Sequence, residues 1–261
     1  MLLAIDAGNT NIVFSIFSGP ELAGSWRVAT RADRTADEYA VFLLQMFEIK
    51  GVNRDKLEAA IISSVVPDAN SALQRLCENH LGIKPWFIGD PALDLGLRIL
   101  IDRPEELGAD RIVNAIAARA ICKPPLLVID FGTATTVDYV NADGDYAGGV
   151  IAPGPNLSLQ ALHMAAAKLP RVAVAAPAKV IATNTVDAMQ AGIFYGYIGM
   201  VEGLIARIRQ ESGHLNMPVL ATGGLAGLFA TATPVFNLHD TELTLRGLKL
   251  IFDRNHHKVL P

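Results

Sequence analysis

The strongest constraint on the fold of this chain is an internal repeat. Residues 2–17 read LLAIDAGNTNIVFSIF, and residues 126–141 read LLVIDFGTATTVDYVN. At an offset of 124 they share Leu2/Leu126, Leu3/Leu127, Ile5/Ile129, Asp6/Asp130, Gly8/Gly132 and Val13/Val137. A repeat near half the chain length predicts two similar domains that face one another, whereas a solenoid needs a period of roughly 20–50 residues. Two such acid-tipped turns can hold a polyphosphate from both sides of a cleft, so the repeat indicates phosphoryl transfer.

The composition limits the class of protein. The chain has 261 residues, which suffices for two domains of roughly 130 residues each. Hydrophobic residues make up 51% and charged residues 18%, so there is enough apolar material for large cores. The net charge is −4 and no run of Lys or Arg occurs. Neither nucleic acid nor an anionic membrane is therefore expected as a partner.

The cysteines and the start of the chain predict a cytoplasmic protein. Cys77 and Cys122 match no metal-binding spacing, and we interpret them as buried thiols in a reducing cytosol. Only five residues precede Asp6, too few for the apolar core of a signal peptide. The most apolar run, 192–201, is stopped by Glu202 and is too short to span a bilayer.

Hydrophobic periodicity predicts an α/β fold with mixed strand directions. In the first half we expect three strands within 2–30, helices at 36–49, 68–81 and 104–121, and strands at 59–66 and 85–89. In the second half we expect the repeated hairpin, a strand at 146–151, helices at 156–168, 187–212 and 241–253, and a strand at 217–221. The predicted domains are 1–120 and 121–261. Small residues share one face of the 187–212 helix and indicate a packing or dimer surface: Ala188, Ala191, Gly192, Gly196, Gly199 and Gly203.

The first candidate site is the turn Asp6-Ala7-Gly8-Asn9-Thr10-Asn11. Glycine allows close approach to a phosphate, whose oxygens backbone N–H groups can bind. A carboxylate at the end of a strand can hold Mg²⁺ through water. One such turn alone could be an ordinary hairpin, because Asp, Gly and Asn are common in turns. The second copy, Asp130 to Thr136, repeats the chemistry and favours the functional interpretation.

The second candidate is Gly108-Ala109-Asp110-Arg111 at a predicted helix start. Adjacent helical residues do not face one another, so this acid and base do not form a simple structural pair. Asp110 could accept a proton from an attacking hydroxyl while Arg111 holds an anionic group of the substrate. A solvated helix start with an acid at its positive end explains the same residues, and the sequence alone does not separate these interpretations.

Other motifs carry less information. Thr222-Gly223-Gly224, between a strand and a predicted helix, could seat a ribose or phosphate, although such a turn alone is a weak signal. Ser63-Ser64 lacks the Gly-x-Ser-x-Gly context of a serine hydrolase. The chain has neither a Walker A sequence nor Gly-x-Gly-x-x-Gly, which argues against P-loop and Rossmann nucleotide binding.

Taken together, these residues resemble the type III pantothenate kinase family of the acetate and sugar kinase/actin superfamily. The resemblance covers almost the whole chain and rests on short motifs in a specific order: Asp6–Asn11, Ile62–Pro67, Gly108–Arg111 with Asn114, Asp130–Thr136, Gly148–Gly154, Leu169-Pro170, Asn184-Thr185 and Thr222–Gly224. It implies two ribonuclease H-like, actin-like ATPase domains around a central cleft. It also implies a homodimer.

The resemblance assigns a role to each candidate residue. Asp110 is the implied general base, and Asp130 the implied ligand of K⁺ or NH₄⁺. Thr133 is the implied second contact to the phosphates of ATP, and Thr185 a pantothenate contact near the dimer interface. The implied ATP-binding segment is Asp6, Ala7, Gly8, Asn9, Thr10, Asn11, Ile12 and Val13, with Mg²⁺ bound to ATP. The implied pantothenate-binding residues are Gly108, Ala109, Asp110 and Arg111.

The sequence hypothesis is therefore ATP-dependent phosphorylation of pantothenate to 4′-phosphopantothenate, the first step of coenzyme A biosynthesis. One alternative is another small-molecule kinase of the same superfamily, for example one that acts on a sugar. A catalytically silent regulator is a second alternative, although it predicts a damaged site, and Asp6, Asp110, Arg111 and Asp130 are all present. An actin-like filament protein would need longer insertions than the chain contains.

Overall fold

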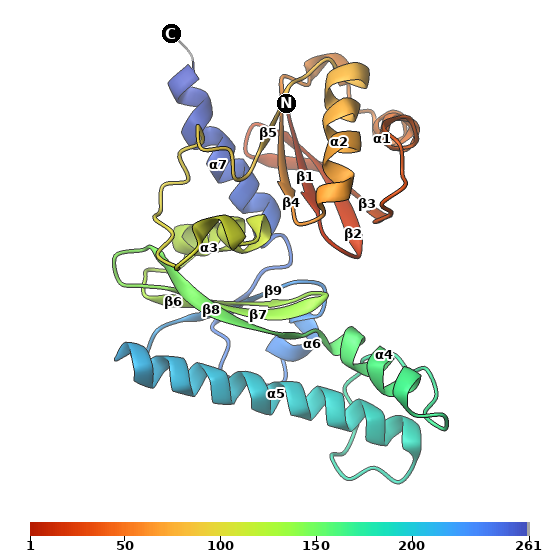
Figure 1. Cartoon of the computed structure of the whole chain (residues 1–261), viewed down its shortest axis with the longest axis vertical. Coiled ribbons are helices and arrows are strands. Elements are labelled where there is room, and N and C mark those ends of the chain that lie inside the picture. The colour runs from red at the N-terminus through yellow and green to blue at the C-terminus, as the bar shows by residue number, and fades with distance from the viewer. Residues whose placement is uncertain (260–261) are drawn as a thin grey trace. The chain divides into compact units, whose positions relative to one another are not determined.

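The computed structural model describes residues 1–259, with side chains for residues 1–256. It divides into two compact units (Figure 1). The first unit contains Met1–Leu97, Asp102–Ala117 and the C-terminal segment from Thr244, and the second contains Arg98–Ile101 and Ala118–Leu243.

The first unit is built on a five-stranded sheet in the order β3-β2-β1-β4-β5. Its central strand β1 pairs antiparallel with β2 and parallel with β4. These pairings determine which ends of the strands meet at one edge of the sheet. The strands are β1 Leu2–Ala7, β2 Asn11–Ser18, β3 Glu21–Ala29, β4 Ala59–Ser64 and β5 Pro85–Phe87. The predicted meander and the two later strands are confirmed.

Helices α1 (Ala36–Lys50) and α2 (Pro67–Arg75) cover one face of this sheet. α2 continues into a π-helical turn at Leu76–His80. Alternate strand residues such as Ile5 and Ile62 pack with α1 and α2 side chains in one buried cluster. Thr35 caps the start of α1, and Gly51, whose φ of 68° is left-handed, caps its end.

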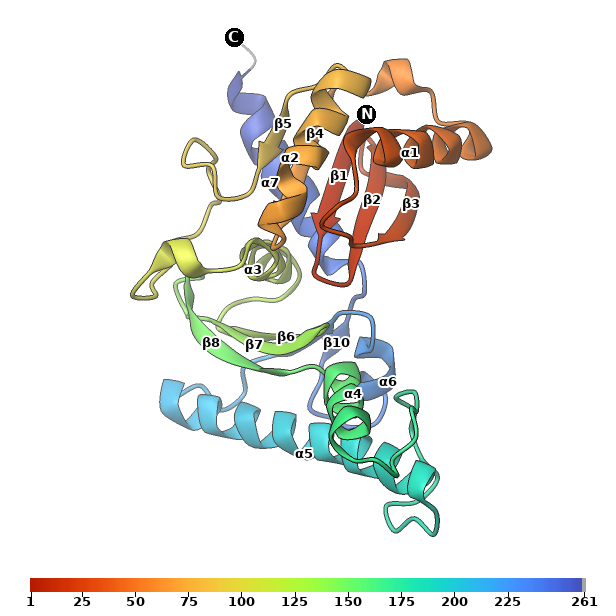
Figure 2. The same ribbon diagram turned by 45° about the vertical axis from the view of Figure 1, so that its right-hand side comes forward.

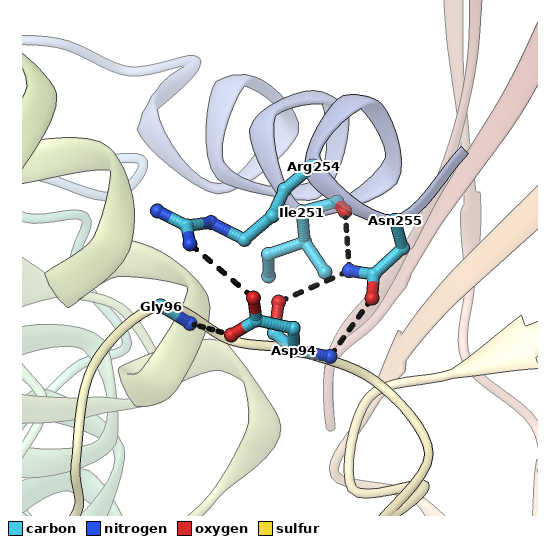
Figure 3. Close-up of polar contacts among 5 residues, drawn as sticks. All are labelled: Asp94, Gly96, Ile251, Arg254 and Asn255. Carbon is cyan, nitrogen blue, oxygen red and sulfur yellow. Dashed lines mark hydrogen bonds and ion pairs between the residues drawn. The ribbon is translucent and has the colours of Figure 1, made fainter. Parts of the chain in front are cut away.

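Helix α7 (Leu243–Val259) packs against the same unit through side chains on the other face of the sheet. Phe252 contacts Trp86 of β5, with ring centroids 5.3 Å apart. The side chain of Asn255 binds both backbone groups of Asp94 (Figure 3). Its Nδ2 donates to the Asp94 carbonyl at 3.0 Å, and its Oδ1 accepts from the Asp94 N–H at 2.8 Å. Arg254 adds a bond to the Asp94 carboxylate at 3.4 Å. These contacts place α7 with the first half of the chain.

The second unit repeats the design with the sheet order β10-β9-β6-β7-β8. Its central strand β6 again has an antiparallel neighbour, β7, and a parallel neighbour, β9. The strands are β6 Leu126–Phe131, β7 Ala134–Val140, β8 Tyr146–Pro153, β9 Val219–Thr222 and β10 Leu238–His239. The short segment 98–101 joins this sheet through a parallel bridge between Ile99 and Tyr146.

Helix α5 (Thr185–Ser212) crosses one face of the second sheet, with α4 (Pro155–Ala165) and α6 (Ala226–Ala230) beside it (Figure 2). Side chains of α5 from Met189 to Ile205 join the buried cluster of this unit. By length and composition α5 is also the one helix in the described chain apolar enough to cross a membrane. A core helix passes the same test, and the packing of α5 on the sheet accounts for its apolar character.

The division differs from the sequence prediction of 1–120 and 121–261 in three respects. Helix α3 (Ala109–Ile121) passes from the first unit to the second at residue 117, slightly before the predicted boundary. The segment 98–101 belongs to the second unit because it pairs with β8. The C-terminal helix belongs to the first unit because its partners are Trp86, Asp94 and Val113. Sequence periodicity finds helices but does not identify the surface on which a helix packs.

The capping box of α1 gives a direct test of the first unit. The Glu38 N–H donates to Thr35 Oγ1 at 3.2 Å, and the Thr35 N–H donates to Glu38 Oε2 at 2.8 Å. We expect Thr35→Ala to lower the free energy of unfolding by about 1 kcal/mol, because it leaves a helix N–H without its partner. Urea unfolding measures the change. Thr35→Ser keeps the cap and is the control; an equal loss in both variants would contradict the interpretation.

Candidate active site

The two repeated acids occupy equivalent positions in the two sheets. Asp6 lies opposite Val13 on β2 and Ser63 on β4. Asp130 lies opposite Thr136 on β7 and Thr222 on β9. Each acid therefore stands at the end of a central strand, next to a hydroxyl residue on the parallel neighbour.

The register corrects one detail of the sequence repeat. The turn between β1 and β2 covers residues 8–10, whereas the turn between β6 and β7 covers only 132–133. Beyond the turn the equivalent of Val13 is consequently Thr136, opposite its acid, and not Val137. Equivalent residues are 124 positions apart in the first strand of each hairpin and 123 positions apart in the second strand.

The first turn is held closed by hydrogen bonds. The Gly8 N–H donates to the Asn11 carbonyl at 3.0 Å, and the Thr30 hydroxyl donates to the Gly8 carbonyl at 2.6 Å. The Thr30 N–H also donates to the Thr10 carbonyl at 3.0 Å. The end of β3 thereby fixes both sides of the predicted phosphate turn.

Ser63 adds a polar group beside Asp6 that the sequence analysis did not select. Partners opposite one another in a sheet point to the same face, so Ser63 and Asp6 share a face. The Ser63 hydroxyl is fully buried and has no hydrogen-bond partner among the described residues. An unpaired buried hydroxyl costs on the order of 1–3 kcal/mol, and a polar ligand bound at this edge would satisfy it.

The second turn packs closely against glycines. The Gly154 N–H donates to the Thr133 carbonyl at 3.0 Å, and a Cβ on Gly154 would lie only 2.3 Å from that oxygen. A Cβ on Gly223, whose φ is +91°, would lie 2.3 Å from Asp130 Oδ1. The structure therefore brings the Thr222-Gly223 turn next to Asp130. That this turn seats a ribose or a phosphate stays a prediction.

Asp110 lies in the first turn of α3 within the first unit. Its Oδ1 accepts the Arg111 N–H at 2.8 Å. A Cβ on Gly108 would lie 2.7 Å from this same oxygen and 3.4 Å from Val65 Cγ1. Val65 in turn donates its N–H to the Ala7 carbonyl at 3.0 Å. Val65 thus links the proposed base to the first phosphate turn at one edge of the first sheet.

The environment of Asp110 argues against a solvated helix start. Burial raises the pKa of this carboxyl, and the Arg111 N–H and guanidinium oppose the rise without cancelling it. A carboxyl with a raised pKa in a partly buried position is a candidate for proton transfer.

The remaining predicted residues are distributed over both units. Gly108, Ala109 and Arg111 accompany Asp110 in the first unit, and Thr133 and Asp130 lie in the second. Thr185 is the exposed first residue of α5, whose N-cap is Asn184, also in the second unit. The role of Thr185 stays a prediction.

Oxygen donors make both acidic turns suitable for hard cations. Asp6 has the Ser63 hydroxyl on its face, and Asp130 has Thr136 and Thr222 as register partners. Carboxylate and hydroxyl oxygens suit Mg²⁺ and K⁺, and the glycines leave room for close approach. Thr136 Oγ1 donates its proton to Asp138 at 3.1 Å, so its lone pairs stay available to a cation.

Sequence reasoning missed Ser63 and Val65 as site neighbours. The motif containing Ser63 and Val65 was noticed, but their proximity to Asp6 and Asp110 depends on parallel pairing between strands more than 50 residues apart. The available signal was a hydroxyl near the end of a buried β-branched strand, which mirrors Thr222 at the end of β9.

Comparisons with known proteins identify the family of this chain. The profile of the family described as type III pantothenate kinase matches residues 2–207. The type III pantothenate kinase of Paramagnetospirillum magneticum is 60% identical over 259 residues, which cover 99% of this chain and 99% of the relative.

Solved structures share the fold at low identity. A putative Baf family transcriptional activator from Campylobacter jejuni has a TM-score of 0.63 at 21% identity, covering 98% of this chain and 99% of that one. A putative 2-dehydro-3-deoxygalactonokinase from Sinorhizobium meliloti has a TM-score of 0.57 at 15% identity, covering 100% and 97%. These likenesses support the expected α/β class with two actin-like sheet domains.

The raised pKa of Asp110 predicts a pH-dependent stability change. Its pKa is higher in the folded than in the unfolded chain, so the charged form weakens the fold at neutral pH. We expect Asp110→Asn to raise the free energy of unfolding at neutral pH. The gain should shrink as the pH falls and the wild-type carboxyl becomes protonated.

Urea unfolding at neutral and mildly acidic pH measures this effect. Asp33→Asn, at an exposed loop residue, is the matched control and should change stability little at either pH. A neutral-pH stability of Asp110→Asn equal to or below that of the wild type would contradict the burial argument.

Proposed function

We propose that this chain, which belongs to the type III pantothenate kinase family, transfers the γ-phosphoryl group of ATP to the primary hydroxyl of pantothenate. The products are 4′-phosphopantothenate and ADP, and the reaction is the first step of coenzyme A biosynthesis. The observation that carries the proposal is the placement of Asp110: a partly buried carboxyl, linked through Val65 to the first phosphate turn.

Asp110 is the proposed general base. It accepts the proton of the pantothenate hydroxyl as the hydroxyl oxygen bonds to the γ-phosphorus and the bond to the leaving ADP oxygen breaks. A base works best when its pKa is near the operating pH, and burial moves the pKa of Asp110 in that direction. Positioning and electrostatics supply most of the remaining rate, because phosphoryl transfer needs little covalent chemistry from the protein.

The phosphates of ATP are the proposed ligands of the two repeated turns. Segment Asp6–Val13 offers backbone N–H groups and the Asp6 carboxylate, and the buried Ser63 hydroxyl faces the same edge. Thr133 is the proposed second phosphate contact, held in place by Gly154. A kinase that uses ATP needs a divalent cation. Asp6 would hold Mg²⁺ through water, where the ion would neutralise part of the triphosphate charge.

Asp130 is the proposed ligand of a monovalent cation, K⁺ or NH₄⁺. The support is its carboxylate between Thr136 and Thr222 on the neighbouring strands, with Gly223 close beside it. A monovalent cation there would add positive charge near the second phosphate turn.

Pantothenate carries a carboxylate, and Arg111 with Gly108–Asp110 is its proposed binding stretch. Thr185 is a further proposed contact, contributed near the interface of a homodimer. Exposed apolar side chains in and around α4 and the start of α5 support such an interface, among them Met164 at 76% and Ile181 at 85% exposure. Nothing in the charge of the chain favours nucleic acid or a membrane as a partner, and the proposed location is the cytoplasm.

Two other functions remain distinguishable by experiment. A sugar kinase of the same superfamily would release ADP with a sugar and not with pantothenate, so a substrate panel read by ADP release separates them. A silent regulator would release no ADP with any acceptor. The presence of Asp6, Asp110 and Asp130 favours an active kinase.

The proposed base is tested by Asp110→Asn. We expect kcat to fall by about 10²–10⁴-fold, because the variant cannot accept the proton. Pantothenate affinity, measured by calorimetry, should change little. The assay is ADP formation in the presence and absence of pantothenate, with Asp33→Asn as the control. Unchanged kcat in Asp110→Asn would remove Asp110 from this role.

The proposed cation ligand is tested by Asp130→Ala. We expect activation by K⁺ to be lost or to require at least about tenfold more K⁺, because one carboxylate contact is removed. ADP formation is titrated with KCl at constant ionic strength, using a large cation for compensation. Asp143→Asn changes an exposed acid of the same unit and should keep the wild-type dependence. Wild-type K⁺ dependence in Asp130→Ala would refute the assignment.

A further inference from the structure

Helix α7 contacts α3 at Asn114, one helical turn beyond the proposed base Asp110. Thr244 Oγ1 donates to Oδ1 of Asn114 at 2.8 Å. Asn114 is only 1% exposed and follows Asp110 by four residues, so the two lie on the same face of α3. The hydrogen bond therefore acts on the face of α3 that carries the base.

A second contact, one turn along α7, brings the two backbones together. A Cβ on Gly247 would lie 2.3 Å from the Val113 carbonyl oxygen and 2.6 Å from Val113 Cγ1. Only glycine permits this approach. Two contacts at successive positions of α3, 113 and 114, restrict both its rotation and its sliding along α7.

The far end of α7 is anchored independently of α3. Asn255 is 6% exposed and bonds to both backbone groups of Asp94, and its amide also donates to the Ile251 carbonyl at 2.8 Å (Figure 3). Phe252 packs on Trp86 of β5. Helix α7 is thus fixed to the first sheet and the segment after it, and can serve as a rigid support.

The start of α3 needs such a support. Its first backbone bonds, from Arg111 and Ile112, both converge on the Gly108 carbonyl at 3.1 and 3.3 Å. Gly108 has no side chain to restrict its backbone dihedral angles, so this residue alone does not fix the direction in which α3 starts. Contacts further along α3 must therefore contribute to fixing the direction of Asp110.

We propose that Thr244 is a positioning residue for phosphoryl transfer, which holds α3 through Asn114 and thereby keeps the Asp110 carboxylate in place. This inference rests on the proposed function of Asp110. Thr244 acts through the helix and has no direct role in the chemistry. A displacement of about 1 Å in a reacting group can cost about 10²-fold in rate, so a modest loosening of α3 is enough to matter.

The test compares Thr244→Val, which removes the hydroxyl at nearly constant volume, with Thr244→Ser, which keeps it. For Thr244→Val we expect kcat to fall about tenfold while KM for ATP changes less than about twofold, and amide hydrogen exchange in residues 109–117 to accelerate. Thr244→Ser should restore kcat to within about twofold of the wild type. Thr244→Ala removes the same hydroxyl and carries the same expectation should Thr244→Val not fold.

Thr35→Ala is the control for a general loss of stability in the same unit. It removes the cap of α1, which has no part in the support of α3, and should lower the melting temperature while kcat stays within about twofold of the wild type. The proposal is overturned if the hydroxyl-deleting variant keeps wild-type kcat, or loses no more kcat than Thr35→Ala at an equal fall in melting temperature. Failure of Thr244→Ser to restore kcat would also overturn it.

Hydrogen exchange separates this proposal from the proposed function. Suppose that the wild-type chain forms no ADP with pantothenate, while amide exchange in α3 is faster in Thr244→Val than in the wild type. Pantothenate would then be refuted as the substrate, and the finding that Thr244 restrains α3 would still be supported. Unchanged exchange and kcat in an active enzyme would refute the positioning role alone.

Discussion

Each half of this chain depends on one central strand that pairs antiparallel with the strand after it and parallel with a distant one. In the first unit β1 lies between β2 and β4, and in the second β6 lies between β7 and β9. Because parallel strands end at the same edge, the hairpin turn and the loop after the parallel neighbour meet there. The acid, the glycine turn and a hydroxyl from a remote segment are gathered at that edge for this reason.

The edge of the first sheet supports the base as well as the phosphate turn. Val65 continues directly from β4, bonds to the backbone of Ala7, and lies beside Gly108 at the start of α3. Any shift of β4 against β1 would therefore move Asp110 relative to the first turn. Helix α7 restrains the same element from another direction, through Thr244 and Gly247. The proposed catalytic geometry thus depends on segments from the start, the middle and the end of the chain.

The stability of this arrangement and its function make opposite demands. Burial raises the pKa of Asp110 and leaves the Ser63 hydroxyl without a partner, and both lower the stability of the fold. Buried groups of this kind are expected where a ligand or a proton completes the site. The well-paired residues, such as those of the α1 capping box and the Asn255 anchor, lie away from the edge.

Most elements of the fold could be read from the sequence. The strands of both hairpins, helix α1 and the long α5 follow from local periodicity and turn residues, and they are confirmed. The short α6 and β10 were missed because segments of five and two residues carry too little periodicity. For the site, the repeat identified Asp6 and Asp130 as equivalent, and the structure places them at equivalent strand ends.

By itself, the sequence determined the elements, the duplicated acidic turns and the family, because these depend on local order along the chain. Only the tertiary structure decided that β4 lies beside β1 and that α7 packs against α3 of the first unit. It also showed that the turn between β6 and β7 is one residue shorter than the turn between β1 and β2. Those facts depend on which surfaces bury each other across 50 to 130 residues of chain. Hydrophobic patterning shows that a face is buried, but many partners of similar shape could cover it, and only the packed structure selects one.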